Sequence, residues 1–339
     1  MYSSPCTILA IESSCDDTSA AIIKDGIMLS NIVATQEIHR KYGGVVPELA
    51  SRAHQQNIVP VVLAALENAN IVKNDLKAVA YTQGPGLLGS LLVGCSFAKS
   101  LSLALSIPLI AVDHMQAHVL AHFIEDPKPV FPFLCLTVSG GHTQIVLVES
   151  ALRMKVIGRT IDDAVGEAFD KSAKMLNLPY PGGPLVDKLA QTGNPLAYKF
   201  SKTQVEGLNF SFSGIKTSIL YFLKANIAID PDFIQKNLAD ICASIQSALI
   251  NMLVEKLIKA VDQTGIKQVA IAGGVSANSG LRTRMQSLAF EKGLEVFIPK
   301  LEYCTDNAGM IAMAAHFKFQ EGIFEDLNSG PNPRLNSFV

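Results

Sequence analysis

Apolar and polar positions alternate in short blocks at the start of the chain. Three apolar runs, at residues 7–14, 20–23 and 27–35, are separated by the polar turn SSCDDTS and by the turn KDG. Short apolar runs bounded by turn residues are typical of β-strands, so this pattern predicts a three-stranded meander. The elements expected next are a helix over 47–70 that contains Pro60, a strand over 77–82, and a helix opened by GPGLLGS.

The same pattern begins again near residue 130. Residues 132–150 show a strand, a polar Gly-Gly turn and a strand, and residues 153–160 form a third apolar run. A helix is expected over 162–177, where the leading acids Asp162 and Asp163 suit a helix N-terminus. A strand and helix over 266–286, a strand over 295–300, a helix over 304–319 and an irregular tail from residue 329 complete the expected elements.

Two halves that each begin with a meander and continue with alternating helices and strands predict an internally duplicated α/β fold. We expect one subdomain at 1–113 plus 317–339 and the other at 114–316, with a cleft between them. Ligands in such folds bind at strand ends and helix N-termini, so the polar turns of both halves should face this cleft.

Composition narrows the class of protein. The chain has 339 residues, of which 49% are hydrophobic, and its formal net charge is −2. This excludes a disordered chain and a strongly basic nucleic-acid binder, so contact with nucleic acid would need a local basic patch or a partner protein. The six cysteines form no CxxC pair, the start lacks a signal-peptide pattern, and Lys99 and Pro108 interrupt the longest apolar stretch. We therefore expect a reduced, cytoplasmic protein that does not enter a membrane.

Three histidines recur at every fourth residue in VDHMQAHVLAHF, namely His114, His118 and His122. Residues four apart share one face of a helix, but His114 and His122 would be roughly 12 Å apart. Metal–nitrogen bonds are about 2 Å long, so one ion cannot bind all three, and a purely structural role stays open. The position of His114 directly after a strand favours the pair His114 and His118, and Asp306 is a candidate third ligand for zinc or iron. Met115 stands where the HExxH peptidase motif requires glutamate, which argues against a metallopeptidase.

Other polar clusters have two interpretations. The glycine pairs in VSGGHTQ (138–144) and IAGGVSAN (271–278) are either ordinary tight turns or sites where backbone N–H groups approach an anion. The acids Glu12, Asp16 and Asp17 in ESSCDDT would either bind Mg²⁺ or lie in a solvated turn, and their spacing favours the solvated turn.

Taken together, these stretches resemble one family from about residue 7 to residue 325. They include ESSCDDT, YGGVVPELASRAH, HMQAH, VSGGHTQ, DDAVGEAFDK, YPGGP, FSFSGIKT, IAGGVSAN and CTDNAGMIA. In this order they resemble the bacterial tRNA adenosine threonylcarbamoyltransferases, formerly called glycoproteases. The resemblance implies the actin/Hsp70/sugar-kinase (ASKHA) type of α/β fold. It also implies an acyltransferase that moves threonylcarbamoyl from threonylcarbamoyl-AMP to the exocyclic amine of the adenosine 3′ of the anticodon, in tRNAs that read codons beginning with A.

The resemblance also assigns residues and partners. It implies one divalent metal, iron(II) or alternatively zinc(II), bound by His114, His118 and Asp306, and it leaves His122 as structural. The substrate-binding residues that it implies are Thr137, Val138, Ser139, Gly140, Gly141, Asp170, Gly183, Asp187 and Asn278. No catalytic residue is assigned, although Glu12 is a candidate general base. The expected partners are tRNA, a non-catalytic paralogue of the same fold and a small ATPase. A small-molecule kinase of the ASKHA fold and a non-catalytic nucleotide-binding scaffold are the alternatives.

Overall fold

The computed structural model describes residues 6–36, 39, 42–203 and 205–338. The chain forms two compact units. Unit 1 comprises Met1–Pro129, Glu149–Met154 and Pro299–Val339, and unit 2 comprises Val130–Val148 and Lys155–Ile298.

The first unit is built on a five-stranded sheet of order β3-β2-β1-β4-β5. Its strands are β1 (Thr7–Glu12), β2 (Thr18–Lys24), β3 (Ile27–Ala34), β4 (Ala78–Gly84) and β5 (Leu109–Asp113). The first three strands form an antiparallel meander, and β4 and β5 run parallel to β1. Every residue of β1 is buried, as expected for a central strand whose two faces are both covered.

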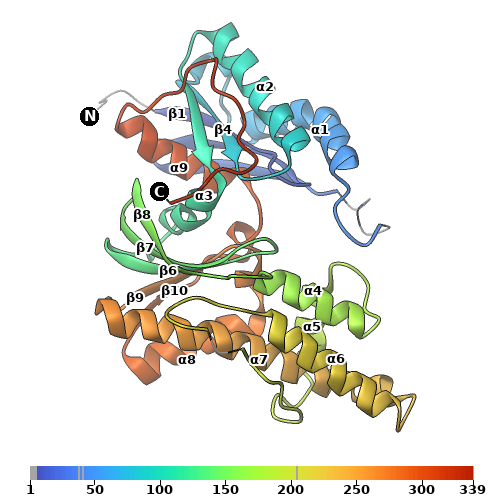
Figure 1. Ribbon diagram of the computed structural model, residues 1–339. Helices are drawn as coiled ribbons and strands as arrows, with labels where there is room; N and C mark the ends of the chain where they lie inside the picture. The colour runs from blue at the N-terminus through green and yellow to red at the C-terminus, as the bar shows by residue number, and fades with distance from the viewer. Residues whose placement is uncertain (1–5, 37–38, 40–41, 204, 339) are drawn as a thin grey trace. The chain divides into compact units, whose positions relative to one another are not determined.

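Helices cover both faces of this sheet. They are α1 (Pro47–Asn68), α2 (Leu88–Leu105), α3 (His114–Leu120) and α9 (Ala308–Gln320), with short 3₁₀ turns η2 (Lys73–Asp75), η3 (Ala121–Phe123) and η5 (Leu301–Tyr303). In Figure 1, α1 and α2 lie on one side of β1 and β4, and α9 lies on the other with α3 packed against it. Because α3 and α9 pack on each other and α9 packs on this sheet, residues 114–129 and 299–316 belong to unit 1. The division therefore differs from the expected one at 113/114 and 316/317.

The second unit repeats the topology of the first. Its sheet has the order β10-β9-β6-β7-β8, with β6 antiparallel to β7 and parallel to β9. The strands are β6 (Phe133–Val138), β7 (Thr143–Ser150), β8 (Arg153–Arg159), β9 (Gln268–Ala272) and β10 (Glu295–Phe297). Strands β6 to β10 occupy the positions that β1 to β5 occupy in the first sheet, which confirms the internal duplication predicted from the two meanders.

One layer of helices packs on the second sheet. They are α4 (Val165–Met175), α5 (Gly182–Ala190), α6 (Ser213–Ile227), α7 (Phe233–Thr264) and α8 (Ser279–Lys292), with η4 (Gly274–Ala277) between β9 and α8. Figure 1 shows α4 to α8 along one side of this sheet. The expected helix over 162–177 begins only at Val165, so Asp162 and Asp163 precede it. Neither side chain caps the helix: Asp162 accepts a hydrogen bond from the backbone of Phe212 (2.8 Å), and Asp163 pairs with Lys171 (2.8 Å).

Two helices, α2 and α7, are long and apolar enough to cross a membrane by length and composition. Both also serve as core helices. In α7, 67% of the most apolar 18-residue segment is buried, and this helix contributes many residues to the apolar core of unit 2. In α2, 33% of the window is buried, and Leu91, Cys95 and Ala98 lie inside unit 1.

Candidate functional site

Helix α3 begins directly at the end of the buried strand β5. Asp113 is the N-cap of this helix, and its Oδ1 accepts hydrogen bonds from the backbone N–H groups of Met115 (2.8 Å) and Gln116 (3.0 Å). Side-chain capping of this kind satisfies N–H groups that have no partner inside a helix. It places His114 at the first helical position and His118 one turn later on the same side.

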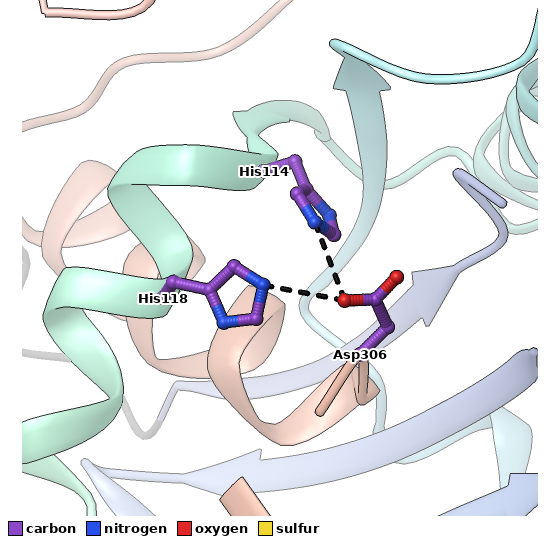
Figure 2. Close-up of side chains that lie close together, drawn as sticks. All are labelled: His114, His118 and Asp306. Carbon is purple, nitrogen blue, oxygen red and sulfur yellow. Dashed lines mark hydrogen bonds and ion pairs between the residues drawn. The ribbon is translucent and has the colours of Figure 1, made fainter. Parts of the chain in front are cut away.

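Both histidines of α3 face the carboxylate of Asp306, which lies just before α9 (Figure 2). Oδ1 of Asp306 is 3.2 Å from Nε2 of His118 and 3.4 Å from Nε2 of His114. One ligand atom from each of the three residues lies within 4.8 Å of the others. The structure therefore brings together the three residues that the sequence analysis names as metal ligands, although His118 and Asp306 are 188 positions apart.

A second carboxylate lies behind His114. Glu12, at the end of β1, is fully buried, and its Oε2 is 3.1 Å from Nδ1 of His114. Oε2 also accepts a hydrogen bond from Oγ1 of Thr82 (2.6 Å), and Oε1 accepts one from the backbone N–H of Ser14 (2.5 Å). Because an ionised carboxylate can only accept, Nδ1 of His114 carries a proton and its Nε2 is left to face Asp306.

The charges of this cluster strongly perturb one another. Burial opposes ionisation of Asp306, but His114 and the hydrogen bonds from His114 and His118 outweigh it and hold the pKa of Asp306 far below its ordinary value. Burial likewise disfavours a charged His114, but Asp306 and Glu12 raise its pKa well above the ordinary histidine value. Despite complete burial, His114 also lowers the pKa of Glu12. The cluster therefore attracts positive charge, as a proton or as a cation.

The three residues suit a divalent cation of borderline softness. Nδ1 of His114 donates its proton to Glu12, so in a neutral His114 the other ring nitrogen, Nε2, carries a lone pair. This lone pair faces an oxygen of Asp306, and two acceptors can lie this close only with a proton or a cation between them. His118 is also nearly fully buried, and its Nδ1 has no hydrogen-bond partner among the residues that the structure describes. Two imidazole nitrogens and one carboxylate are a common protein ligand set for Fe(II) and Zn(II).

The third histidine of the repeat takes no part in this cluster. His122 lies in η3, is buried, and is not among the described His, Cys, Asp and Glu residues that could hold an ion. Helix α3 ends at Leu120, so the three histidines do not share one continuous helix. Met115 is buried, and the general-base glutamate of the peptidase motif is absent from its position.

The acidic residues at the end of β1 and in the turn after it are less exposed to solvent than expected. Glu12 has no exposed surface, so the interpretation of all three acids as a solvated turn is wrong for this residue. Burial, together with the negative charges of Asp16 and Asp306, raises the pKa of Asp17 to about 7. Sequence spacing missed both Glu12 and Thr82 as supports of His114. The only available signal for Glu12 was its position at the polar end of a buried strand.

Unit 2 contains a cavity of about 260 Å³. It is lined by Gly140, Gly166, Phe169, Asp170, Pro181, Gly183, Pro184, Asp187, Gly274, Val275, Ala277 and Asn278. Five residues that the resemblance assigns to the substrate are among them, namely Gly140, Asp170, Gly183, Asp187 and Asn278. The flanking residues of the same glycine-rich motifs supply most of the others.

The polar residues of this cavity are held by helix N-termini. Oδ1 of Asp170 accepts hydrogen bonds from the backbone N–H groups of Gly182 (2.9 Å) and Gly183 (3.0 Å) at the start of α5. The carboxylate of Asp187 accepts from the backbone N–H (2.9 Å) and hydroxyl (2.7 Å) of Ser279 at the start of α8. Each carboxylate is thus fixed in orientation and keeps unused acceptor capacity for a ligand.

Asn278 is fixed in the same way. Its Oδ1 accepts a hydrogen bond from the backbone N–H of Leu281 (2.9 Å), and its Nδ2 donates to Oε1 of the buried Gln246 (2.8 Å). Gln246 is a support of the cavity that no motif in the sequence indicated.

Four of the predicted substrate residues do not line the cavity: Thr137, Val138, Ser139 and Gly141. Thr137 and Val138 belong to the fully buried strand β6. Ser139 closes the following turn, because its backbone N–H donates to the carbonyl of His142 (2.8 Å) and its hydroxyl accepts from the N–H of His142 (3.1 Å).

Known proteins share both the sequence and the fold. The family model "TsaD: tRNA N6-adenosine threonylcarbamoyltransferase" matches residues 27–313. A protein of that name from Cytophaga hutchinsonii is 63% identical over 97% of this chain and 96% of its own length. Another from Christiangramia forsetii is 64% identical over 95% of both chains.

Solved structures with low sequence identity have the same fold. HypF from T. kodakarensis aligns with 94% of this chain and 49% of its own, with a TM-score of 0.64 and 15% identity. Component A of the (R)-2-hydroxyglutaryl-CoA dehydratase from Acidaminococcus fermentans aligns with 93% of this chain and 98% of its own, with a TM-score of 0.53 and 17% identity. These likenesses confirm the ASKHA fold class. The match to the family model and to relatives over nearly the whole chain shows that this chain belongs to the tRNA N6-adenosine threonylcarbamoyltransferase family.

Proposed function

We propose that this chain transfers threonylcarbamoyl from threonylcarbamoyl-AMP to N6 of the adenosine 3′ of the anticodon, in tRNAs that read codons beginning with A. Membership of the family supports a transferase that modifies tRNA. The observation that carries the proposal is the cluster of His114, His118 and Asp306, with Glu12 behind His114. Neither a small-molecule kinase nor a nucleotide-binding scaffold of the same fold requires such a cluster.

The reaction replaces one acyl bond by another. N6 of adenosine attacks the carbamoyl carbon of the mixed anhydride, a carbon–nitrogen bond forms, and the bond from this carbon to the phosphate oxygen breaks. AMP leaves with the electron pair, and N6 loses one proton. The exocyclic amine of adenine is a weak nucleophile, which is why the carbamoyl group must arrive with a good leaving group.

His114, His118 and Asp306 are proposed to hold one divalent cation, iron(II) or alternatively zinc(II). Such a cation supplies Lewis acidity and a template for oxygen atoms of the donor. Glu12 keeps the proton of His114 on Nδ1 and so holds Nε2 toward Asp306. The three donors of Glu12 are all internal groups, so Glu12 is better suited to orienting His114 than to taking a proton from tRNA.

The cavity of unit 2 is proposed to bind the nucleotide part of the donor. Asp170 and Asp187 keep acceptor capacity for ribose hydroxyls, and Phe169 offers an apolar surface to a base. Gly140 and Gly274 let the chain backbone approach anionic oxygens, whose developing charge N–H groups would stabilise.

The chain is further proposed to act in the cytoplasm with partner proteins. Its sequence pI is about 6.4 and its net charge is −2, whereas contacts to nucleic acid are strongly electrostatic. Additional positive surface from a non-catalytic paralogue of the same fold and from a small ATPase would assist tRNA binding.

The test combines the purified chain, its paralogue and the ATPase with threonylcarbamoyl-AMP and a tRNA transcript that reads a codon beginning with A. Digestion to nucleosides and mass spectrometry should detect threonylcarbamoyladenosine and an equal amount of AMP. A matched transcript with guanosine in place of the target adenosine should stay unmodified.

The variant His114→Ala, with metal analysis of the same preparation, tests the role of the cluster. We expect it to lose both the metal and the modified nucleoside. A variant that kept its metal and full activity would overturn the proposal, and phosphorylation of a small molecule with no modified tRNA would favour the kinase.

A further inference from the structure

The tail expected to be irregular is held on unit 1 by several contacts. The backbone N–H of Asn332 donates to the carbonyl of Gln83 at the end of β4 (2.7 Å), and the N–H of Gly86 donates to the carbonyl of Pro333 (3.2 Å). In Figure 1 this segment, in dark red, runs over the ends of the strands and back towards α3. The tail is therefore packed against unit 1 as part of its fold.

The approach between the tail and β4 is very close. A Cβ atom added at Gly84 would lie 1.9 Å from the carbonyl oxygen of Asn332, and the backbone at Gly84 has a φ of +156°. Only glycine combines this backbone conformation with so little space. The loop that follows β4 is thus shaped to receive the tail.

The tail then reaches Asp113, the N-cap residue of α3. The hydroxyl of Ser337 donates to Oδ1 of Asp113 (2.9 Å), which is the oxygen that also accepts from the N–H groups of Met115 and Gln116. Asp113 is buried and directly precedes His114. One carboxylate oxygen therefore joins the tail to the first turn of the helix that carries both histidines.

We propose that Ser337 is a positioning residue for the metal centre, acting through Asp113 on the orientation of α3. The inference rests on the proposed function, because it takes His114, His118 and Asp306 to be metal ligands. Helix α3 spans only seven residues, and so short a helix depends on external contacts for its orientation. Metal–ligand distances tolerate deviations of only about 0.2 Å, so a small shift of α3 weakens metal binding.

The experiment measures Co²⁺ binding by the full-length, metal-depleted chain, using a chromophoric chelator as competitor and the visible spectrum of the bound ion. Ser337→Ala removes the hydroxyl and Ser337→Thr retains it. Ser329→Ala is the matched control, because Ser329 lies on the same tail and accepts its hydrogen bond from Gln83, whereas the hydrogen bond to Asp113 comes from Ser337. Urea unfolding of each metal-free variant reports whether the fold is preserved.

Removing a residue that hydrogen-bonds to a metal ligand usually lowers metal affinity about 10–100-fold. Ser337 is one contact further from the metal, so we expect Ser337→Ala to lower Co²⁺ affinity about 3–10-fold and to alter the visible spectrum of the bound ion. Ser337→Thr and Ser329→Ala should stay within about twofold of the wild type. In an Asp113→Ala background, which has no side-chain oxygen to accept from Ser337, Ser337→Ala should have no further effect, since residues that act through each other are not additive.

Equal affinity and spectrum in Ser337→Ala and the wild type would overturn the inference while leaving the metal centre intact. An equal loss in Ser329→Ala would also overturn it, because the effect would then come from the tail as a whole. A wild-type chain that binds no Co²⁺ would overturn the proposed metal centre, and this inference with it.

Discussion

Oε2 of Glu12 lies 3.1 Å from Nδ1 of His114, and Glu12 has no exposed surface. A buried carboxylate behind a histidine fixes which ring nitrogen carries the proton and how the ring is oriented. In this chain the last residue of β1 thereby controls the first residue of α3.

Replacing Glu12 by Gln should therefore weaken metal binding without breaking up unit 1. The amide keeps the shape of the side chain but removes the negative charge that stabilises His114, so we expect a loss of about 10–100-fold in affinity for Zn²⁺. Competition with a chelator measures it. Asp16→Asn removes a charge from the same turn and is the control, and an equal loss in that variant would show that charge alone matters.

Variants of His118 and His122 should behave differently, because His118 is a proposed metal ligand and His122 is structural. His118→Ala removes a ligand nitrogen, so its loss of metal affinity should exceed the roughly 10–100-fold cost of an outer-shell change. His122→Leu should retain one metal per chain and lower only the free energy of unfolding, because His122 is buried in η3. Metal content by mass spectrometry and urea unfolding measure the two effects. Loss of metal in His122→Leu would contradict the assignment.

Local patterns were sufficient to predict the fold. The two meanders could be recognised because strand alternation and turn residues are local signals, and the strand order of both sheets agrees with them. The unit boundaries were not predictable in this way. They depend on α3 packing against α9, two helices almost 200 positions apart whose contact leaves no local pattern.

The candidate site was likewise predictable only where its residues follow a local pattern. Helical spacing placed His114 and His118 together, and the sequence made Asp306 a candidate third ligand that the family resemblance then supported. Glu12 was named as a candidate general base, but its contact with His114 was not predicted, because all of β1 is buried and alternation cannot indicate which side chain faces His114. Val138 begins the VSGGHTQ motif and Thr137 directly precedes it, yet both lie in a strand whose side chains are buried, and the cavity begins only at Gly140.

Acidification should destabilise the fold through His54. Burial lowers the pKa of His54, whose ring contacts Oγ1 of Thr18 (2.7 Å) and the carbonyl of Cys15 (3.1 Å). Because the folded state disfavours protonation, the unfolded chain binds more protons below the ordinary histidine pKa of about 6.5. Stability is therefore complete above this value and is lost as the pH falls through it toward the folded pKa.

Asp17, whose pKa is raised to about 7, contributes the opposite sign in this range, so the sign for His54 is tested by the difference between the wild type and His54→Gln in urea unfolding between pH 7.5 and 5.5. One histidine changes the free energy of unfolding by at most about 1.4 kcal/mol per pH unit. His54→Gln, which keeps a donor for the carbonyl of Cys15, should lose less stability than the wild type as the pH falls from 7.5 to 5.5. An unchanged slope in this variant would assign the effect to other groups, such as His316, whose pKa burial also lowers.

Two glycines near the cavity of unit 2 should respond differently to alanine. A Cβ at Gly166 would lie 2.6 Å from the carbonyl oxygen of Ser139, whereas a Cβ at Gly141 meets no atom within 4 Å. Gly166 lines the cavity and its N–H donates to that carbonyl (3.2 Å), so the added methyl must push α4 away from the β6–β7 turn.

We expect Gly166→Ala to cost about 1–3 kcal/mol of stability and to weaken AMP binding, and Gly141→Ala to change neither. Calorimetric titration with AMP and urea unfolding of both variants measure these effects. Weaker AMP binding in Gly141→Ala, at unchanged stability, would show that the nucleotide extends beyond Gly140 along the turn.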